Sequence, residues 1–208
     1  MSEDETSGCV DFGSRRVPEQ EKAPLIRALF DSVASRYDLM NDLMSGGIHR
    51  SWKAEMVAWL KPRPGQVLLD VAGGTGDIAL RVLPRLAGGP SGPIRSVVVC
   101  DASARMLEVG RGRALDEGIL SGIEWVCGDA ERLPVTDRSV DLYSFHLVPL
   151  LGRIVTGDRG AYAYLVESIR RFPRQSELCE MIARAGLDQV RFRNLTGGVA
   201  ALHSAWRL

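Results

Sequence analysis

The chain has few cysteines and no clustered metal ligands. Among its 208 residues only Cys9, Cys100, Cys127 and Cys179 are cysteines, and they form no C-x-x-C pair and have no close histidine. This pattern argues against structural zinc and against a disulfide framework. We therefore predict no metal site and a reducing compartment.

Long apolar runs and an excess of one charge are also lacking. No run approaches the ~20 apolar residues of a membrane span, and the acidic stretch Met1–Thr6 lacks the apolar core of a signal peptide. The 26 basic and 26 acidic residues give a net charge of zero, whereas a nucleic-acid-binding protein should carry a basic excess. The sequence predicts a cytoplasmic protein without a nucleic-acid partner.

The remaining composition is that of one globular domain, which we place over residues 18–208 after a polar and loose N-terminus, 1–17. Helical spacing of apolar residues predicts a cap over 18–62, with helices from Pro18 to Val33, over Arg36–Met44 and over His49–Leu60. These helices are rich in methionine and aromatic residues. They either cover one edge of a sheet or form a mobile lid over an apolar ligand.

Strands and helices alternate after the cap, which predicts an α/β fold with an open, mostly parallel sheet. Residues 63–141 form the first half of this sheet and 142–208 a C-terminal half. The predicted strands are Val67–Val71, Arg95–Asp101, Gly122–Cys127 and Leu142–Val148, with helices over Asp77–Leu86 and Ala102–Leu115. Helices over Ala161–Phe172 and Gln175–Ala185 follow, then an antiparallel pair, Gln189–Asn194 and Val199–Trp206, joined by the turn Thr196-Gly197-Gly198.

The most informative stretch is the glycine turn Gly73-Gly74-Thr75-Gly76, which follows the first strand and precedes a helix. Such a turn presents backbone N–H groups to a nucleotide-like ligand. Three carboxylates lie near the ends of successive predicted strands. Asp70 precedes the turn, Asp101 ends the second strand and Asp129 follows the third. The acid after the second strand is placed to accept hydrogen bonds from ribose hydroxyls, and the next one from an adenine amino group.

Two classes of cofactor, NAD and S-adenosylmethionine, are bound by this layout of strand, glycine turn and helix. An NAD-binding fingerprint requires a third glycine at the G-x-G-x-x-G spacing, and this chain has Asp77 at the start of the helix instead. A pyrophosphate would meet that negative charge, whereas the sulfonium of S-adenosylmethionine would be attracted to it. The residues thus favour S-adenosylmethionine over NAD, although Asp77 could also simply cap the helix that it begins.

Several blocks resemble the C-methyltransferase family of ubiquinone and menaquinone biosynthesis. They are Phe30–Asp42, Ser45–Lys53, Leu69–Asp77, Gly128–Pro134, Tyr164–Pro173 and Asn194–Ala200. The resemblance implies a Rossmann-like class I methyltransferase that uses S-adenosylmethionine to methylate a ring carbon of a polyprenylated benzoquinol or naphthoquinol. It implies the polyprenyl quinol as partner, and it leaves open a homodimer and contact with the inner membrane or with a quinone-biosynthesis complex.

The resemblance also implies roles for individual residues. Thr75, Asp101, Asp129 and Ala130 fall at the family's cofactor-contacting positions. Together with Asp70, Gly73, Gly74 and Gly76, which the turn itself indicates, they make up the predicted cofactor-binding set. A base that assists deprotonation of the quinol would complete the chemistry. The candidates for it are Tyr37, Asp38 and His49, and His146 more often would be a core histidine.

The chain departs from the family after Asp141. Family members continue there through a fourth strand with a Phe-Gly-(Leu/Ile)-Arg-Asn segment, a helix, a Lys-Pro-Gly-Gly turn and a fifth strand, and this chain runs straight into Leu142. Either Leu142–Val148 serves as the fourth strand and the sheet closes up without a fifth, or the fold is compromised. Three functions stay open at this point: a quinol C-methyltransferase, an inactive cofactor-binding relative or scaffold, and an NAD-dependent oxidoreductase.

Overall fold

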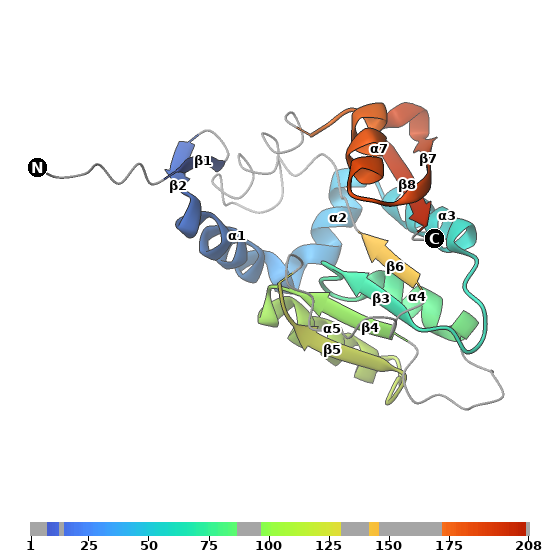
Figure 1. Cartoon of the computed structure of the whole chain (residues 1–208). Helices are drawn as coiled ribbons and strands as arrows, with labels where there is room; N and C mark the ends of the chain where they lie inside the picture. Colours follow the sequence, from blue (N-terminus) through green and yellow to red (C-terminus); the bar gives the residue numbers. More distant parts are fainter. Residues whose placement is uncertain (1–7, 13–14, 87–96, 130–141, 146–171, 207–208) are drawn as a thin grey trace, which may run out of the picture.

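The computed structural model describes residues 8–12, 15–86, 97–129, 142–145 and 172–206. They form a helical N-terminal part, a central sheet and a helix-plus-hairpin unit (Figure 1).

The N-terminal part contains the three predicted helices, α1 (Glu19–Val33), α2 (Tyr37–Ser45) and α3 (His49–Leu60), with a 3₁₀ turn, η1 (Ala34–Arg36), before α2. Gly46 ends α2 in the left-handed conformation at φ 57°, and its N–H bonds to the carbonyl of Asp42. A glycine at this place is the usual end of a helix, because it adopts positive φ without a steric cost.

Part of the segment 1–17 that we predict to be loose is described by the structure and has regular secondary structure there. Strands β1 (Cys9–Phe12) and β2 (Arg15–Pro18) form an antiparallel pair. Phe12 and Val17 are buried, and the N–H of Glu19 bonds to the carbonyl of Gly8 at 3.0 Å. The burial of these two apolar side chains stabilises the short hairpin next to α1.

The central sheet has the strand order β5-β4-β3-β6, and all three neighbouring pairs are parallel. The strands are β3 (Leu68–Val71), β4 (Val97–Asp101), β5 (Ile123–Cys127) and β6 (Leu142–Phe145). The helices α4 (Asp77–Leu86) and α5 (Ala104–Asp116) lie together behind the sheet in Figure 1. The predicted open parallel α/β sheet is confirmed.

Strand β6 shows whether the residues after Asp141 can serve as the fourth strand of the sheet. Its four residues pair in parallel with β3, in the register Leu68 with Leu142 to Val71 with Phe145. The stretch that directly follows Asp141 therefore does serve as the fourth strand of the sheet. The rest of the expected strand, 146–148, lies outside the described residues.

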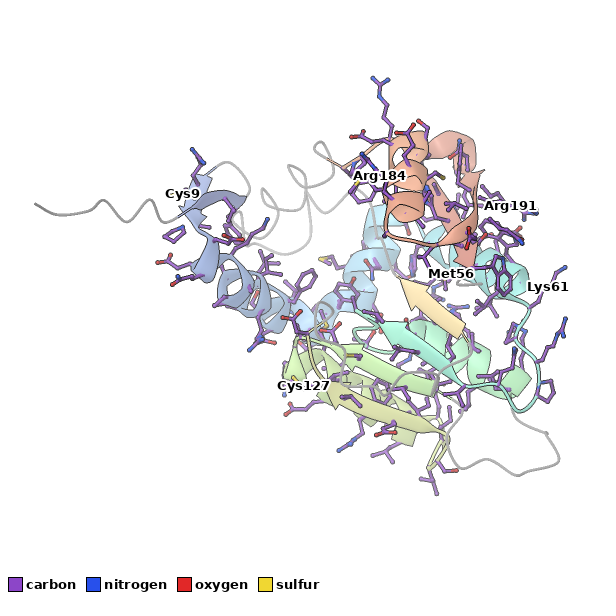
Figure 2. The ribbon with its side chains drawn as sticks, viewed as in Figure 1. Cys9, Met56, Lys61, Cys127, Arg184 and Arg191 are labelled. Carbon is purple, nitrogen blue, oxygen red and sulfur yellow. The ribbon has the colours of Figure 1, made fainter. Side chains whose placement is uncertain are left out.

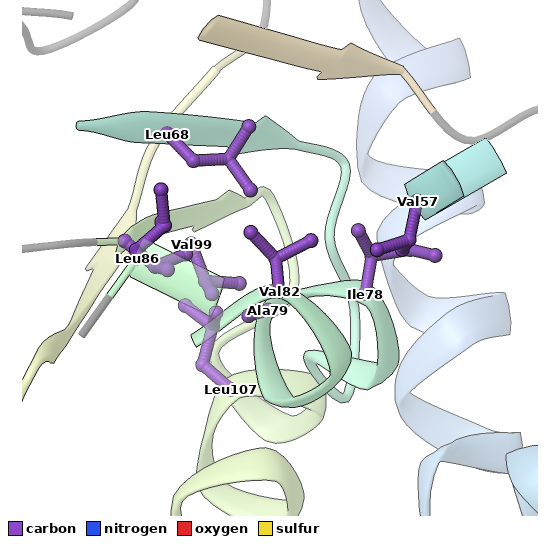
Figure 3. Packing of buried hydrophobic residues seen from close by; sticks show 9 residues of the cluster. Val57, Leu68, Ile78, Ala79, Val82, Leu86, Val99 and Leu107 are labelled. Carbon is purple, nitrogen blue, oxygen red and sulfur yellow. The ribbon is translucent and has the colours of Figure 1, made fainter. Parts of the chain in front are cut away.

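The main core lies between the sheet and its helices. Figure 3 shows side chains of β3, β4, α4 and α5 packed together with Val57 of α3. Leu68, Val82 and Val99 in this cluster have no exposed surface. Truncation of one such side chain to alanine typically costs about 2–5 kcal/mol. Because Val57 joins the same cluster, helix α3 of the cap shares this core with the sheet.

The C-terminal unit consists of α7 (Gln175–Arg184), β7 (Asp188–Leu195), the 3₁₀ turn η2 (Thr196–Gly198) and β8 (Ala200–Trp206). Strands β7 and β8 are antiparallel, as predicted. The expected helix over 161–172 falls almost entirely outside the described residues. No helix in the described ranges is both long enough and apolar enough to cross a membrane.

The C-terminal unit is bound to helix α3. Trp52 Nε1 donates to Thr196 Oγ1 at 2.8 Å. Arg193 forms an ion pair with Glu55, and its guanidinium lies 5.4 Å from the ring centre of Trp59. Figure 2 shows the side chains in this region, with Met56 on α3 and Arg191 on the hairpin. These contacts fix the hairpin to the cap.

Candidate functional site

The glycine turn between β3 and α4 is packed tightly enough to require its glycines. A Cβ atom on Gly73 would lie 2.7 Å from Val99 Cγ1 and 3.0 Å from the carboxyl carbon of Asp70. Gly76 adopts φ 72°, and a Cβ there would lie 2.5 Å from the ring of Trp125. The turn thus brings backbone close to its surroundings at two points where a side chain has no room.

Trp125 of β5 holds this turn from one side. Its ring also faces Gly110 of α5, where a Cβ would lie 2.5 Å from the ring and 2.8 Å from the carbonyl oxygen of Thr75. Sequence reasoning missed both residues. A glycine inside a predicted helix was the available signal, because it costs roughly 1 kcal/mol there relative to alanine and needs a packing reason.

Asp101 connects the turn to the next helix. Its Oδ2 accepts from the N–H of Gly74 at 2.9 Å, and its Oδ1 accepts from the N–H of Ser103, which caps α5, at 2.8 Å. Burial raises the pKa of this carboxyl, the two backbone hydrogen bonds oppose that shift, and the charge of Asp70 adds to it. A carboxylate has about four lone-pair sites, so Asp101 retains capacity to accept hydrogen bonds from a ligand diol.

The other predicted cofactor acids lie differently. Asp70 is fully buried in β3, and its carboxylate lies beneath Gly73, so it supports the turn from the core side. Asp129 is exposed, two residues after β5 ends at Cys127. Ala130 lies outside the described residues. The structure therefore brings Asp101 to the turn and leaves Asp129 at the edge of the described site.

A small pocket opens beside the turn, between it and the helical cap. It is lined by Tyr37 of α2, Lys53 of α3, Asp77 of α4 and the turn residues Ala72, Gly73, Gly74 and Thr75. The cap helices thus form one wall of the pocket. Lys53 was not predicted as a site residue, although it lies in one of the blocks that carry the family resemblance.

Asp38 links the cap to the turn. Thr75 Oγ1 donates to Asp38 Oδ1 at 3.2 Å, and Arg113 of α5 donates from Nη1 to Asp38 Oδ2 at 3.2 Å. The side chain of Asp38 is 43% exposed. Asp38 is thus held at one edge of the turn and still reaches solvent, although like His49 it does not line the pocket among the described residues.

Tyr37 and His49, the other two candidate bases, differ from Asp38. Burial raises the pKa of Tyr37 to about 12, although a hydrogen bond with Asn41 opposes the shift, so the phenol is neutral at pH 7. Burial, together with the charge of Lys53, lowers the pKa of His49. The His49 ring lies 2.8 Å from Ser45 Oγ through Nδ1 and does not line the pocket among the described residues.

Asp77 is surrounded by cations. Its carboxylate lies 2.6 Å from Lys53 Nζ, 3.1 Å from Arg81 Nε and 3.4 Å from Arg113 Nη2. Burial raises the pKa of Asp77, but the three cations outweigh it, and the net pKa is about 2. Because its charge is matched, Asp77 would repel a pyrophosphate less than the sequence alone predicted.

Asp77→Asn should reduce the stability of the protein in a pH-dependent way. The wild-type carboxyl has an unfolded pKa near 3.8 and a folded pKa of about 2, so its stabilising effect is complete above pH 4 and is lost as the pH falls toward 2. We expect the variant to be about 1–2 kcal/mol less stable at pH 7, with this difference shrinking between pH 4 and pH 2. Urea unfolding at pH 7, 4 and 3 measures it, and a difference that does not change with pH would contradict the assignment.

The chain has an open parallel sheet, a glycine turn bonded to the acid at the end of the next strand, and a helical wall over the turn. These features define it as a protein of the Rossmann-like methyltransferase class. The model of the ubiE/COQ5 methyltransferase family matches residues 15–144 and 138–207, and the chain belongs to this family. The predicted family is confirmed.

Relatives match over almost the whole chain. The ubiquinone/menaquinone biosynthesis C-methyltransferase UbiE of Cereibacter sphaeroides is 42% identical over 254 residues, covering 99% of this chain and 99% of the relative. The protein of that name from Dinoroseobacter shibae is 43% identical over 252 residues, with 98% of each covered. A solved protein from Bacillus halodurans has a TM-score of 0.49 at 18% identity, covering 69% of this chain and 72% of that chain.

The same alignments confirm that the chain is internally shortened. The alignment with the Cereibacter relative runs over 254 positions, although this chain has 208 residues. The relative therefore contains residues with no counterpart here. The two family matches meet at 138–144, which is where the sequence departs from the family pattern.

Proposed function

We propose that this chain is an S-adenosylmethionine-dependent enzyme that methylates a ring carbon of a polyprenylated benzoquinol or naphthoquinol. The observation that carries the proposal is the bonding of Asp101 to the Gly74 N–H at a glycine turn of a ubiE/COQ5 family member. This arrangement places a carboxylate acceptor next to closely approaching backbone, as a ribose beside the strand ends requires.

The residues around the turn fit the cofactor. The carboxylate of Asp101 would hold the ribose hydroxyls, and the backbone of Gly74, which has positive φ and open space on its Cβ side, would lie against the cofactor. The pocket beyond the turn contains a cation and an anion, Lys53 and Asp77. S-adenosylmethionine supplies the methyl group of the reaction.

The chain contributes orientation and a proton acceptor. We assign the acceptor role to Asp38, because its carboxylate is bonded to Thr75 of the turn and remains partly exposed. Tyr37 is neutral at pH 7 and would act as a hydrogen-bonding group in the pocket. Loss of the quinol proton makes the ring carbon more electron-rich, and a fixed position next to the methyl group then lowers the barrier for attack.

The cap offers an apolar surface for the tail of the acceptor. Leu39 and Leu43 of α2 are 56% and 58% exposed, and Ile48 just before α3 is 39% exposed. Leu39 and Leu43 are four residues apart, so they lie on one face of α2. An isoprenoid chain would remove these side chains from water.

The second candidate is a relative that binds the cofactor and does not transfer methyl groups. It is favoured by the internal shortening relative to these relatives, since the two family matches of this chain overlap at 138–144. The elements around the turn, β3, β4, α4 and α5, lie before this position. The two candidates therefore agree on cofactor binding and differ in turnover.

Binding and turnover are measured separately. Calorimetric titration with S-adenosylhomocysteine and with NAD tests the cofactor, and transfer of a labelled methyl group to a short-tailed demethylated quinol tests the reaction. We expect micromolar binding of S-adenosylhomocysteine and a methylated quinol. Binding without turnover supports the second candidate, and binding of NAD alone would refute both.

A further inference from the structure

We propose that Lys53 binds the carboxylate of the amino-acid end of S-adenosylmethionine and that Lys53 and Asp77 together recognise this zwitterionic group. The inference rests on the proposed function and extends it to a site for one part of the ligand. It assigns a binding role to a residue of the cap helix α3, which lies outside the nucleotide-binding sheet.

The positions of Asp101 and of the pocket indicate where the two ends of the ligand would lie along the turn. Gly74 faces Asp101 through its N–H and also lines the pocket with Lys53 and Asp77. Gly74 therefore adjoins both a hydrogen-bond acceptor for a diol and the Lys53–Asp77 ion pair. A ligand with a ribose at one end and an α-amino-acid group at the other matches this order.

The charges in the pocket match a zwitterion. Among the described residues that line it, Lys53 is the sole cation and Asp77 the sole anion. An α-amino-acid group brings a carboxylate for the first and an ammonium for the second. A phosphate brings negative charge alone, so it could pair with Lys53 but has no cation to offer to Asp77.

Lys53 has hydrogen-bonding capacity that its present partner does not use. The ammonium has three donors, and among described residues it makes one hydrogen bond, to Asp77 Oδ2 at 2.6 Å. Asp77 is also held by Arg81 and Arg113 at 3.1 and 3.4 Å, so it keeps two cations if Lys53 turns toward a ligand. The Lys53 side chain is only 12% exposed, and a bond to a charged group is stronger in such a place than in water.

A comparison of two ligands tests the proposal. S-adenosylhomocysteine has the amino-acid group, and 5′-methylthioadenosine has the same nucleoside without it. We expect Lys53→Gln to weaken calorimetric binding of S-adenosylhomocysteine by about 10- to 100-fold, the usual effect of one hydrogen bond to a charged group. Binding of 5′-methylthioadenosine should change by less than about 2-fold, since that ligand does not reach Lys53.

Arg81→Gln is the matched control, because Arg81 also pairs with Asp77 but does not line the pocket. It should leave the ratio of the two affinities unchanged. If Lys53→Gln weakened the binding of both ligands equally, Lys53 would have a structural role. That result would overturn this inference and leave the proposed function standing. A wild-type chain that binds neither ligand would overturn the proposed function and this inference with it.

A second measurement needs no variant of Lys53 and applies if Lys53→Gln does not fold. Decarboxylated S-adenosylmethionine differs from the cofactor in the carboxylate alone. We expect the wild-type chain to bind it about 10- to 100-fold more weakly than S-adenosylmethionine. Equal affinities would show that no group of the chain recognises the carboxylate, and the inference would be wrong.

Discussion

Asp101→Asn should lower the affinity for S-adenosylhomocysteine by about 100-fold or more, since two hydrogen bonds from a ribose to a charged acceptor are lost. The substitution also changes the hydrogen bonds that hold the glycine turn. Asp101 accepts from the N–H groups of Gly74 and Ser103 with separate oxygens, and an asparagine has one oxygen and one NH₂ group. One of these two backbone donors would then face another donor, which displaces the turn. Calorimetric titration gives the affinity.

Asp116→Asn is the control for this prediction, because Asp116 is an exposed carboxylate at the end of α5 and has the same charge. It should bind S-adenosylhomocysteine as the wild type does. If Asp101→Asn retained an affinity within about 3-fold of the wild type, Asp101 would not be the ribose acceptor.

Gly110→Ala should destabilise the protein by about 3 kcal/mol, which is at the upper end of the range for overpacking a core. The added methyl group would overlap the Trp125 ring at 2.5 Å and the Thr75 carbonyl oxygen at 2.8 Å. The oxygen belongs to the backbone of the glycine turn, so the strain reaches the ligand site directly. We therefore expect weaker binding of S-adenosylhomocysteine as well as a lower midpoint of urea unfolding.

Gly112→Ala gives the matched comparison on the same helix. A Cβ at Gly112 has no atom within 4 Å among the described residues, so the substitution should stabilise α5 by up to about 1 kcal/mol through helix propensity. If the two variants had equal stabilities, the close packing of Gly110 against Trp125 would not constrain the turn.

The sequence predicted the elements that have strong local patterns. Helices α3 and α4 have the predicted bounds, since α3 stops before Pro62 and α4 follows the glycine turn directly. The parallel strands β3 and β4 were predicted because buried apolar runs are typical of such sheets. The β1–β2 hairpin was missed, because each of its strands has only four residues and neither shows a regular alternation of apolar and polar residues.

The site was predicted in part. The glycine turn and Asp101 follow from their places at strand ends, which is a local rule. Lys53, Arg113 and Trp125 lie on three other elements, and they meet the turn only after α3, α5 and β5 have packed. No spacing in the sequence relates Lys53 to Asp77, and the raised pKa of Tyr37 depends on burial that a sequence pattern does not give.

The bond between Trp52 and Thr196 joins residues 144 positions apart. Contacts of such sequence separation slow folding, because a long loop must close before they form. On the ribosome, α3 emerges well before the hairpin that binds it, and Trp52 and Trp59 lack their hairpin contacts throughout synthesis of the sheet. The contacts of the cap with the hairpin can therefore form only after almost the whole chain has been synthesised.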